Sequence, residues 1–303
     1  MSLPLKHIGH KGPNPYGVKT SVRVKSQQTS VAHRLVSYVM RSPVLAASVR
    51  SSWLLFVLVT TLVVATQGVC AQSSVIIAVE DDAAPWSRAD GSGYANDLVV
   101  SAFKAVGVDV ALRVVPYARC KRMAVTGEVA GCFSMSPSPD FDNVLDLSAR
   151  PLFTVNTGYF YNIAKPPRAK RQEDLPDHTV VGTVIGYEYP PILESLRQTG
   201  KVIFEESPSE DINLRKLAAG RIDLALVTYN EMKNPSTLIR QAGATGKVKA
   251  TFLAGPMNSY IGFSRKHSQG SWAREHFDKG FAIISTNGTM KRLRATWLRV
   301  LKK

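Results

Sequence analysis

The sequence predicts an α/β protein made of two similar units. Short runs rich in β-branched residues alternate with segments of helical pattern, so that a strand–helix–strand–helix–strand series occurs twice. The basic, proline-rich stretch 165–171 separates the two series and is expected to be exposed. Because a crossover helix returns the chain beside the strand it has just left, each series predicts a twisted parallel sheet with helices on both faces.

The first series runs from residue 75 to residue 135. Its first run, Val75–Val79, suits a buried parallel strand. Asp97 can cap the helix that follows, and Gly107 and Gly127 each stand where a helix is expected to end. The predicted strands are 75–79, 111–115 and 129–135, and the predicted helices are 97–106 and 117–125.

The second series begins near residue 180, and Gly200 and Gly220 follow its two helices. A tail comes after it without a sheet of its own, so we expect the tail to pack on one of the two units. The predicted strands are 180–184, 201–204 and 223–227 in the series and 248–253 and 259–264 in the tail. The predicted helices are 191–199, 210–219, 271–284 and 289–300.

The composition is that of a folded globular chain, with 303 residues, 45% hydrophobic and 20% charged. It excludes bulk disorder, a collagen-like repeat, a multispan membrane protein and a disulfide-dense scaffold. The net charge of +15 is unevenly placed, because residues 1–71 carry eight Lys+Arg and no acidic residue. This leaves 30 Lys+Arg and 23 Asp+Glu, or +7, in 72–303. About half of the excess charge thus lies in residues 1–71, so the net charge does not indicate a nucleic-acid partner, and we predict none.

The segment before residue 72 has the pattern of a secretory signal peptide. Residues 53–65 form an apolar run preceded by Arg41 and Arg50 and followed by Val69-Cys70-Ala71. We expect cleavage after Ala71. An uncleaved anchor is the alternative, but a transmembrane helix needs ~20 apolar residues and this run is shorter. An ordinary leader would begin at Met40, so we expect that 1–39 is not translated.

Export would remove Cys70 with the leader and place Cys120 and Cys132 in an oxidising compartment. A bridge between them would close a loop of 13 residues and stabilise the fold by roughly 3 kcal/mol in the chain-entropy model. Two unrelated buried thiols are the alternative. No histidine of 72–303 is near either cysteine in sequence, so we expect no zinc site and no other metal or cofactor.

Several motifs of 72–303 occur in a characteristic order and spacing. Together they resemble the type II periplasmic solute-binding proteins, in the extracellular family 3 that includes amino-acid receptors of ABC importers. The most recognisable motif runs from Asn213 to Asp223. The others are the acidic loop from Glu80 to Trp86, Gly93-Tyr94-x-x-Asp97-Leu98, Pro116-Tyr117-Ala118-Arg119, Gly127 to Gly131, Val144 to Ser148 and Gly182 to Gly186.

The resemblance implies two α/β lobes, each a mostly parallel sheet flanked by helices, joined by a hinge of two strands. Lobe 1 would be 72–160 plus 256–303, and lobe 2 would be 161–255. A ligand would bind between the lobes at the carboxyl ends of the strands, and hinge closure would bury it. The implied protein is a monomer of the periplasm that delivers a small solute to the membrane subunits of an ABC permease.

Candidate ligand-binding residues lie in the loops after the strands. Aromatic side chains can form walls, and an arginine can clamp a carboxylate or phosphate in bidentate fashion. Serine hydroxyls can bind a polar group, and a glycine before a helix lets the backbone approach an anion. Core packing, turn chemistry or an ion pair is the alternative for each residue. The candidates are Trp86, Tyr94, Tyr117, Arg119, Ser134, Ser136, Gly186, Tyr187, Tyr189 and Thr228.

Two departures from the family pattern bear on the ligand. Stretch 138–142 has no arginine where amino-acid receptors usually hold the α-carboxylate, and Thr228 stands near the place of an aspartate that often holds the α-ammonium. Arg119 and one of Glu80, Asp81 or Asp82 could substitute for them. We therefore predict a small polar or anionic solute, amino-acid-like or an organic acid, rather than a standard α-amino acid.

Two other functions remain open. Some members of the superfamily resemble dehydratases of prephenate-type substrates, which need a positioned acid or base in the cleft. Glu188 and Asp82 are candidates for that role, but no catalytic constellation is evident and we expect no enzyme activity. The other alternative is a periplasmic sensor that presents its closed form to a membrane receptor, which the sequence does not separate from transport.

Overall fold

The computed structural model describes residues 74–301. The predicted signal peptide and its cleavage point after Ala71 lie outside the described residues. None of the helices in the described part combines the length and the hydropathy needed to cross a bilayer.

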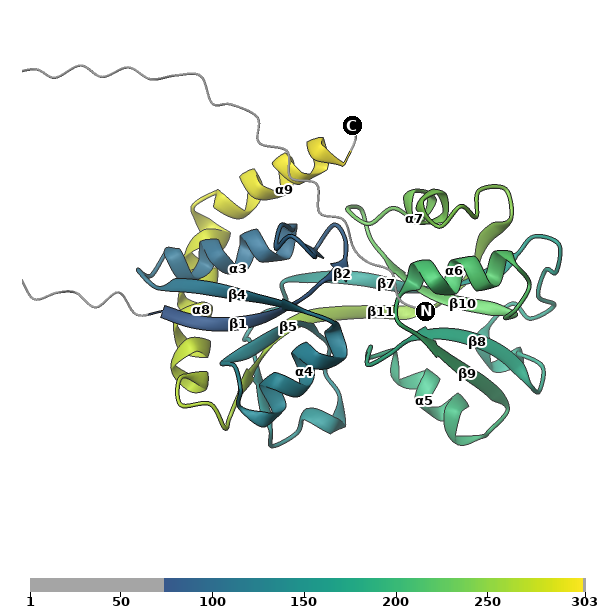
Figure 1. The fold of residues 1–303 in the computed structure, drawn as a ribbon, viewed down its shortest axis with the longest axis horizontal. Coiled ribbons are helices and arrows are strands. Elements are labelled where there is room, and N and C mark those ends of the chain that lie inside the picture. Colours follow the sequence, from purple (N-terminus) through teal and green to yellow (C-terminus); the bar gives the residue numbers. More distant parts are fainter. Residues whose placement is uncertain (1–73, 302–303) are drawn as a thin grey trace, which may run out of the picture. The chain divides into compact units, whose positions relative to one another are not determined.

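The described chain folds into two lobes, each with a mostly parallel sheet (Figure 1). In lobe 1, β1 (Ser74–Glu80) lies between β4 (Asp109–Val115) and β5 (Gly131–Met135) and runs parallel to both. The last residues of β11 (Val248–Ser264) pair antiparallel with β5 and with β6 (Leu145–Leu147).

In lobe 2, β8 (Thr179–Val184) runs parallel to β9 (Val202–Ser207) and to β10 (Leu224–Tyr229). On the other side of β10, β7 (Phe153–Asn162) pairs antiparallel with it and with β11. The predicted fold class, a two-lobed α/β structure with a two-strand hinge, is confirmed.

The hinge consists of β7 and β11, which run from one lobe into the other (Figure 1). β11 is one strand of 17 residues, so the prediction of two separate strands, 248–253 and 259–264, was wrong. Gly255 and Pro256 interrupt the sequence pattern, and the strand accommodates them through register shifts against β7. The predicted lobe boundaries at residues 160 and 255 fall inside these two strands.

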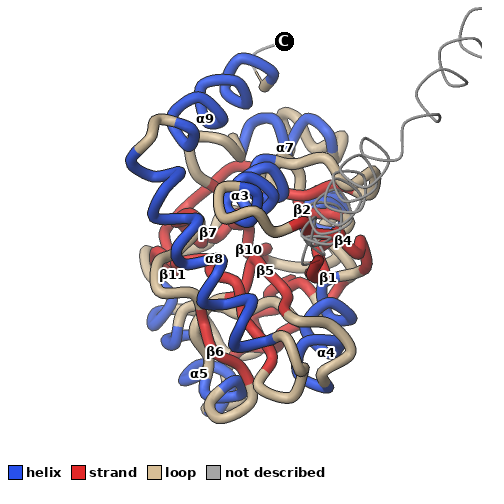
Figure 2. Tube along the Cα trace, turned by 90° about the vertical axis from the view of Figure 1, so that its left-hand side faces the viewer, coloured by secondary structure: helices blue, strands red, loops and turns tan. Residues whose placement is uncertain are grey.

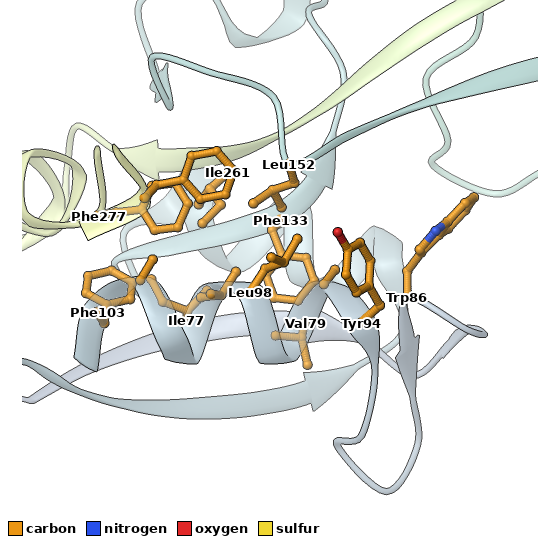
Figure 3. Packing of buried hydrophobic residues seen from close by; sticks show 14 of the residues in the cluster. Ile77, Val79, Trp86, Tyr94, Leu98, Phe103, Phe133, Leu152, Ile261 and Phe277 are labelled. Atoms are coloured by element: carbon orange, nitrogen blue, oxygen red, sulfur yellow. The ribbon is translucent and has the colours of Figure 1, made fainter. Parts of the chain in front are cut away.

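Helices cover both faces of the lobe 1 sheet because neighbouring residues of β1 point to opposite sides. Ile77 and Val79 belong to the core under α3 (Tyr94–Lys104), whereas Ala78 belongs to the core under α4 (Tyr117–Thr126). Figure 3 shows the first of these cores, in which Leu98, Phe103, Phe133 and Phe277 also pack.

The tail packs on lobe 1. The sequence pattern allowed either of the two units, and the family resemblance implied lobe 1. α8 (Gly270–Thr286) and α9 (Thr289–Val300) lie beside α3 (Figure 2). Asp97 does not cap α3, which begins at Tyr94 after Gly93. Instead the Asp97 carboxylate accepts a hydrogen bond of 2.7 Å from Trp297 Nε1 and so joins α3 to α9.

Lobe 2 has the same layered plan. α6 (Glu210–Ala218) and α7 (Pro235–Gln241) pack on one core of the lobe, and α5 (Pro191–Gln198) packs on the other. The remaining short elements are β2 (Asp82–Ala83), β3 (Ser87–Arg88) and the 3₁₀ turns Pro139–Phe141 and Gln172–Asp174.

Cys120 of α4 and Cys132 of β5 form a disulfide, with 5.6 Å between their Cα atoms. Of the two outcomes left open by the sequence, the bridge is therefore the one in the structure. It ties α4 to the strand that follows it in lobe 1.

Candidate functional site

The interlobe cavity, defined by the thirteen residues below, receives side chains from both lobes and from the hinge. It leaves about 50 Å³ for the centres of water molecules. Larger hollows lie elsewhere, but this one is where several strands end. It is lined by Glu80, Ala83, Trp86, Tyr117, Ser134, Ser136, Phe153, Val155, Tyr187, Glu188, Thr228, Met257 and Ser259.

The fold brings the polar residues together at the carboxyl ends of parallel strands. Glu80 is the last residue of β1, and Ser136 directly follows β5. On the lobe 2 side, Glu188 lies in the loop after β8, and Thr228 is close to the end of β10. The ends of parallel strands form the crevice in which α/β proteins bind their ligands, so the cavity has the position expected of a binding site.

One wall of the cavity is aromatic. Trp86 stacks on Phe153, with ring centroids 4.7 Å apart and an interplanar angle of 18°. Tyr117 and Tyr187, from opposite lobes, meet edge to face at 5.2 Å. Such a wall offers flat apolar contact area together with a negative ring face.

Glu188 makes the densest set of contacts between the lobes. Its carboxylate accepts hydrogen bonds from the Tyr117 hydroxyl at 2.6 Å, the Lys121 ammonium at 3.0 Å and the Ser136 backbone N–H at 3.1 Å. Lys121 also donates to the Gly186 carbonyl at 2.6 Å. Burial raises the pKa of Glu188, while Lys121, Tyr117 and Ser136 oppose that rise. These contacts hold the loop after β8 against lobe 1.

Glu80 is the second carboxyl group in the wall and is only 5% exposed. The Tyr187 hydroxyl donates to its Oε1 at 2.6 Å, which is a further contact between the lobes. Burial raises the pKa of Glu80 to about 8, although Tyr187 and Lys233 lower it. At neutral pH this carboxyl therefore carries a proton for most of the time.

A buried ion pair braces the lobe 2 wall. Glu210 and Lys233 form a salt bridge, with side chains 8% and 4% exposed. The same Glu210 carboxylate accepts hydrogen bonds from the backbone N–H and the hydroxyl of Thr228, both at 2.7 Å. The Lys233 ammonium also lies 4.8 Å from the centroid of the Trp86 ring. The pair thus holds Thr228 in place, and its Lys233 ammonium contacts the Trp86 ring of the aromatic wall.

Three polar atoms of the lining residues are buried without a hydrogen-bond partner. They are Ser134 Oγ, Ser259 Oγ and Trp86 Nε1. Buried polar atoms in folded proteins nearly always have a partner, so these three indicate that a polar group can occupy the cavity. Within residues 74–301, no group of His, Cys, Asp and Glu side chains is arranged to hold a metal ion.

No family model and no curated protein matches the sequence. Solved structures do match, with low sequence identity. A histidine kinase sensor domain with similarity to periplasmic binding proteins has a TM-score of 0.63 and 20% identity, covering 75% of this chain and 97% of its own. The described chain has the fold of the type II periplasmic solute-binding proteins.

Two further matches share this periplasmic-binding fold. One is an amino acid ABC transporter substrate-binding protein from Streptococcus pneumoniae bound to L-arginine, with a TM-score of 0.60 and 14% identity, covering 77% of this chain and 98% of that one. The other is an ancestral amino acid-binding protein described as a precursor of cyclohexadienyl dehydratase. Its TM-score is 0.58 and its identity 15%, covering 75% of this chain and 96% of that one.

Within this periplasmic-binding fold, six of the ten candidate residues line the interlobe cavity. Gly186 lies beside it, with a positive φ of 81°. Tyr189 packs in lobe 2, where its hydroxyl accepts a hydrogen bond of 2.8 Å from the Val184 backbone N–H. The six residues in the lining are Trp86, Tyr117, Ser134, Ser136, Tyr187 and Thr228.

The remaining two candidates, Tyr94 and Arg119, also lie outside the cavity lining. Tyr94 is 6% exposed and packs in the core under α3, where Figure 3 shows it among Leu98 and Val79. Arg119 is exposed on α4 and is absent from the lining. Residues two apart on a helix do not share a face, so Arg119 cannot point the same way as Tyr117. The structure therefore does not support Arg119 as an anion clamp.

The sequence did not single out some residues in the lining or in contact with it. Lys121 is four residues after Tyr117 and so shares its helix face, a spacing that could have revealed its contact with Glu188. Phe153, Met257 and Ser259 lie on the hinge strands. Their place at the cavity depends on pairing between segments about 100 residues apart, which no local pattern reports.

Proposed function

We propose that the chain is an exported binding protein that captures a small polar solute between its lobes and delivers it to an ABC permease. The observation that carries the proposal is the interlobe cavity. Its polar wall comes from both lobes, and Ser134, Ser259 and Trp86 each present a buried polar atom without a partner. The match to an ABC transporter substrate-binding protein supports the same function.

Closure of the lobes is the event that would couple solute binding to the permease. A ligand that touches both lobes binds the closed form more tightly than the open form and shifts the population toward it. Tyr117 and Ser136 offer contacts on one lobe, and Tyr187 and Thr228 offer them on the other. The permease would then recognise the closed pair of lobes.

Of the two solute chemistries predicted from the sequence, we favour the polar solute over the anionic one. Arg119 is not at the cavity, and two carboxyl groups, Glu80 and Glu188, line it. We further propose that the protein works as a monomer in the periplasm after cleavage behind Ala71. Lobe boundaries near residues 160 and 255 remain part of this proposal.

The experiment is thermal unfolding of the exported, oxidised protein with a panel of amino acids, organic acids, amines and sugars. A ligand at 100 times its Kd should stabilise the fold by about 2.7 kcal/mol, which is a shift of a few degrees for a chain of this size. A well-folded protein that no member of the panel stabilises would count against solute capture. The N-terminal sequence of the same sample is expected to begin at Gln72.

A dehydratase-type enzyme is the second candidate function. The observation that favours it is Glu80, a buried carboxyl whose pKa of about 8 suits a general acid at neutral pH. Of the two acids proposed from the sequence, Glu188 lines the cavity but is bound to Lys121, and Asp82 is outside the lining. A turnover assay with a prephenate-type substrate separates the two functions, because a binding protein releases its ligand unchanged.

A sensor role is the third candidate, and the match to a histidine kinase sensor domain supports it. Ligand capture and lobe closure would be the same in a sensor and in a transport protein. A permease gene beside the gene for this protein is the expected finding if the protein serves transport.

A further inference from the structure

The groups of lobe 1 that could bind an anion in the interlobe cavity are already occupied by the protein itself. The Tyr117 hydroxyl, the Lys121 ammonium and the Ser136 backbone N–H all donate to the carboxylate of Glu188. A solute carboxylate would have to displace Glu188 from three hydrogen bonds, at least one of them charge-assisted. The Glu188 carboxylate of lobe 2 therefore already occupies the position at which lobe 1 could bind an anion.

Glu80, by contrast, lacks a cationic partner. Its carboxyl accepts a hydrogen bond from Tyr187, and none of the Lys or Arg side chains in residues 74–301 forms a salt bridge with it. The two nearby ammonium groups are engaged elsewhere, Lys121 with Glu188 and Lys233 with Glu210. None of the lining residues is basic. The cavity thus has a buried acid without a cationic partner.

The rest of the lining suits a cation with N–H groups. Ser259 is 5% exposed and its hydroxyl has no partner, so it can accept a hydrogen bond from a ligand. The stacked rings of Trp86 and Phe153 offer aromatic surface to a positive group. The small volume restricts the ligand to a few heavy atoms near these groups, or to one end of a longer chain.

We propose that the interlobe cavity takes a small organic cation without a carboxylate, a primary amine or a guanidine, and that Glu80 is its counter-charge. The proposal rests on the proposed function of solute capture and names the chemical class of the solute. It differs from the amino-acid class in that the solute brings no anion, because Glu188 already fills that position.

Cation binding should release a proton. Burial raises the pKa of Glu80 to about 8, so the group must lose its proton to balance a bound cation. Below pH 8 the affinity for an amine should therefore increase with increasing pH, by up to about tenfold per pH unit. The titratable and charged groups that interact with Glu80 are Asp82, Tyr117, Tyr187, Glu210 and Lys233. Glu188 lines the same cavity.

The test is isothermal titration calorimetry of the exported protein between pH 6 and pH 8. The probes are ethylamine, ethanolamine and guanidinium as cations, acetate and glycolate as anions, and glycine and L-arginine as zwitterions. We expect the cations to bind most tightly and to release a proton, seen as a heat that depends on the buffer. Glu80→Gln should weaken cation binding by at least about tenfold and remove the proton release.

Two variants complete the test. Asp82→Asn removes a carboxylate two residues from Glu80 but outside the lining, so cation binding should change by less than with Glu80→Gln. Glu188→Ala frees the Tyr117, Lys121 and Ser136 donors, so acetate should stabilise this variant and not the wild type. Acetate that binds the wild type as well as the variant would contradict the occupied anion position.

The outcomes separate this proposal from the proposed function. Tighter binding of anions or zwitterions than of cations would leave solute capture standing and overturn the cation proposal. Cation binding that Glu80→Gln leaves unchanged would overturn it as well. A wild-type protein that is well folded and binds none of the probes would contradict the cation proposal, whereas a hit from a wider panel would still support solute capture.

Discussion

At the scale of single residues, Glu80 has the most consequential environment. It ends β1, is 5% exposed and meets the Tyr187 hydroxyl rather than a cation. Its pKa rises from the usual 4.5 to about 8, mainly because burial disfavours the charged form. Between pH 4.5 and about pH 8 the Glu80 carboxyl is mostly protonated in the folded protein and mostly ionised in the unfolded chain. The contribution of Glu80 to stability is therefore greatest at low pH and is lost as the pH rises toward 8.

Glu80→Gln should change this pH dependence. The amide can accept the Tyr187 hydrogen bond as the protonated acid does, but it never becomes charged. One pKa unit corresponds to about 1.4 kcal/mol, so the gain in the free energy of unfolding over wild type should be small near pH 5 and reach a few kcal/mol at pH 8. Urea unfolding at both pH values measures it. Parallel pH profiles for variant and wild type would show that Glu80 is ionised normally.

At the scale of elements, the junction between α4 and β5 carries the disulfide. Cys120 and Cys132 are both fully buried, and each packs in the core on the α4 side of the lobe 1 sheet. The bridge closes the short connection that contains Gly127, which ends α4 with a positive φ of 84°. In the unfolded chain the closed loop reduces conformational freedom, so the bridge favours the folded state.

Replacement of both cysteines by alanine should lower the free energy of unfolding by roughly 3 kcal/mol, as the chain-entropy model gives for a loop of this length. Chemical unfolding with and without a reductant measures the effect. The reductant should destabilise the wild type and leave the double variant unchanged. Equal sensitivity of both proteins to the reductant would show that the bridge is not the source of the stability.

At the scale of the whole described molecule, contacts between the lobes favour the closed arrangement. Glu188 and Tyr187 reach lobe 1 through hydrogen bonds, and Arg294 of α9 forms a salt bridge with Glu231 of lobe 2. Gly186 brings the loop after β8 close to α4. A Cβ atom added there would lie 3.0 Å from Ala118 Cβ. The substituted residue would also have to keep the left-handed φ of 81°. The glycine therefore permits close approach of the lobes.

Gly186→Ala should open the lobes, and Gly200→Ala is its matched control. Gly200 also has a positive φ, of 66°, but nothing lies within 4 Å of an added Cβ. Both variants should lose about 1–2 kcal/mol of stability from the left-handed backbone. Only Gly186→Ala should increase the radius of gyration in small-angle X-ray scattering and weaken solute binding. An equal radius for both variants would mean that Gly186 does not control closure.

Local pattern in the sequence was sufficient for the order and type of most elements. Runs such as Val75–Val79 and stop signals such as Gly127 and Gly220 act through backbone sterics and burial within a few residues, so they can be read without the fold. The same local reasoning indicated Trp86 and Tyr187 as site residues, because loops after parallel strands meet at one edge of a sheet.

The identity of the charged groups at the cavity depended on contacts between distant parts of the chain. Arg119 and Lys121 differ by two positions on α4, yet only Lys121 contacts Glu188. The packing of α4 on the lobe 1 sheet determines which of its side chains face lobe 2. Glu80 is 107 residues from Tyr187, and its shifted pKa arises from burial between the lobes. Desolvation and long-range pairing are properties of the folded molecule, so they came from the tertiary structure rather than from the order of residues.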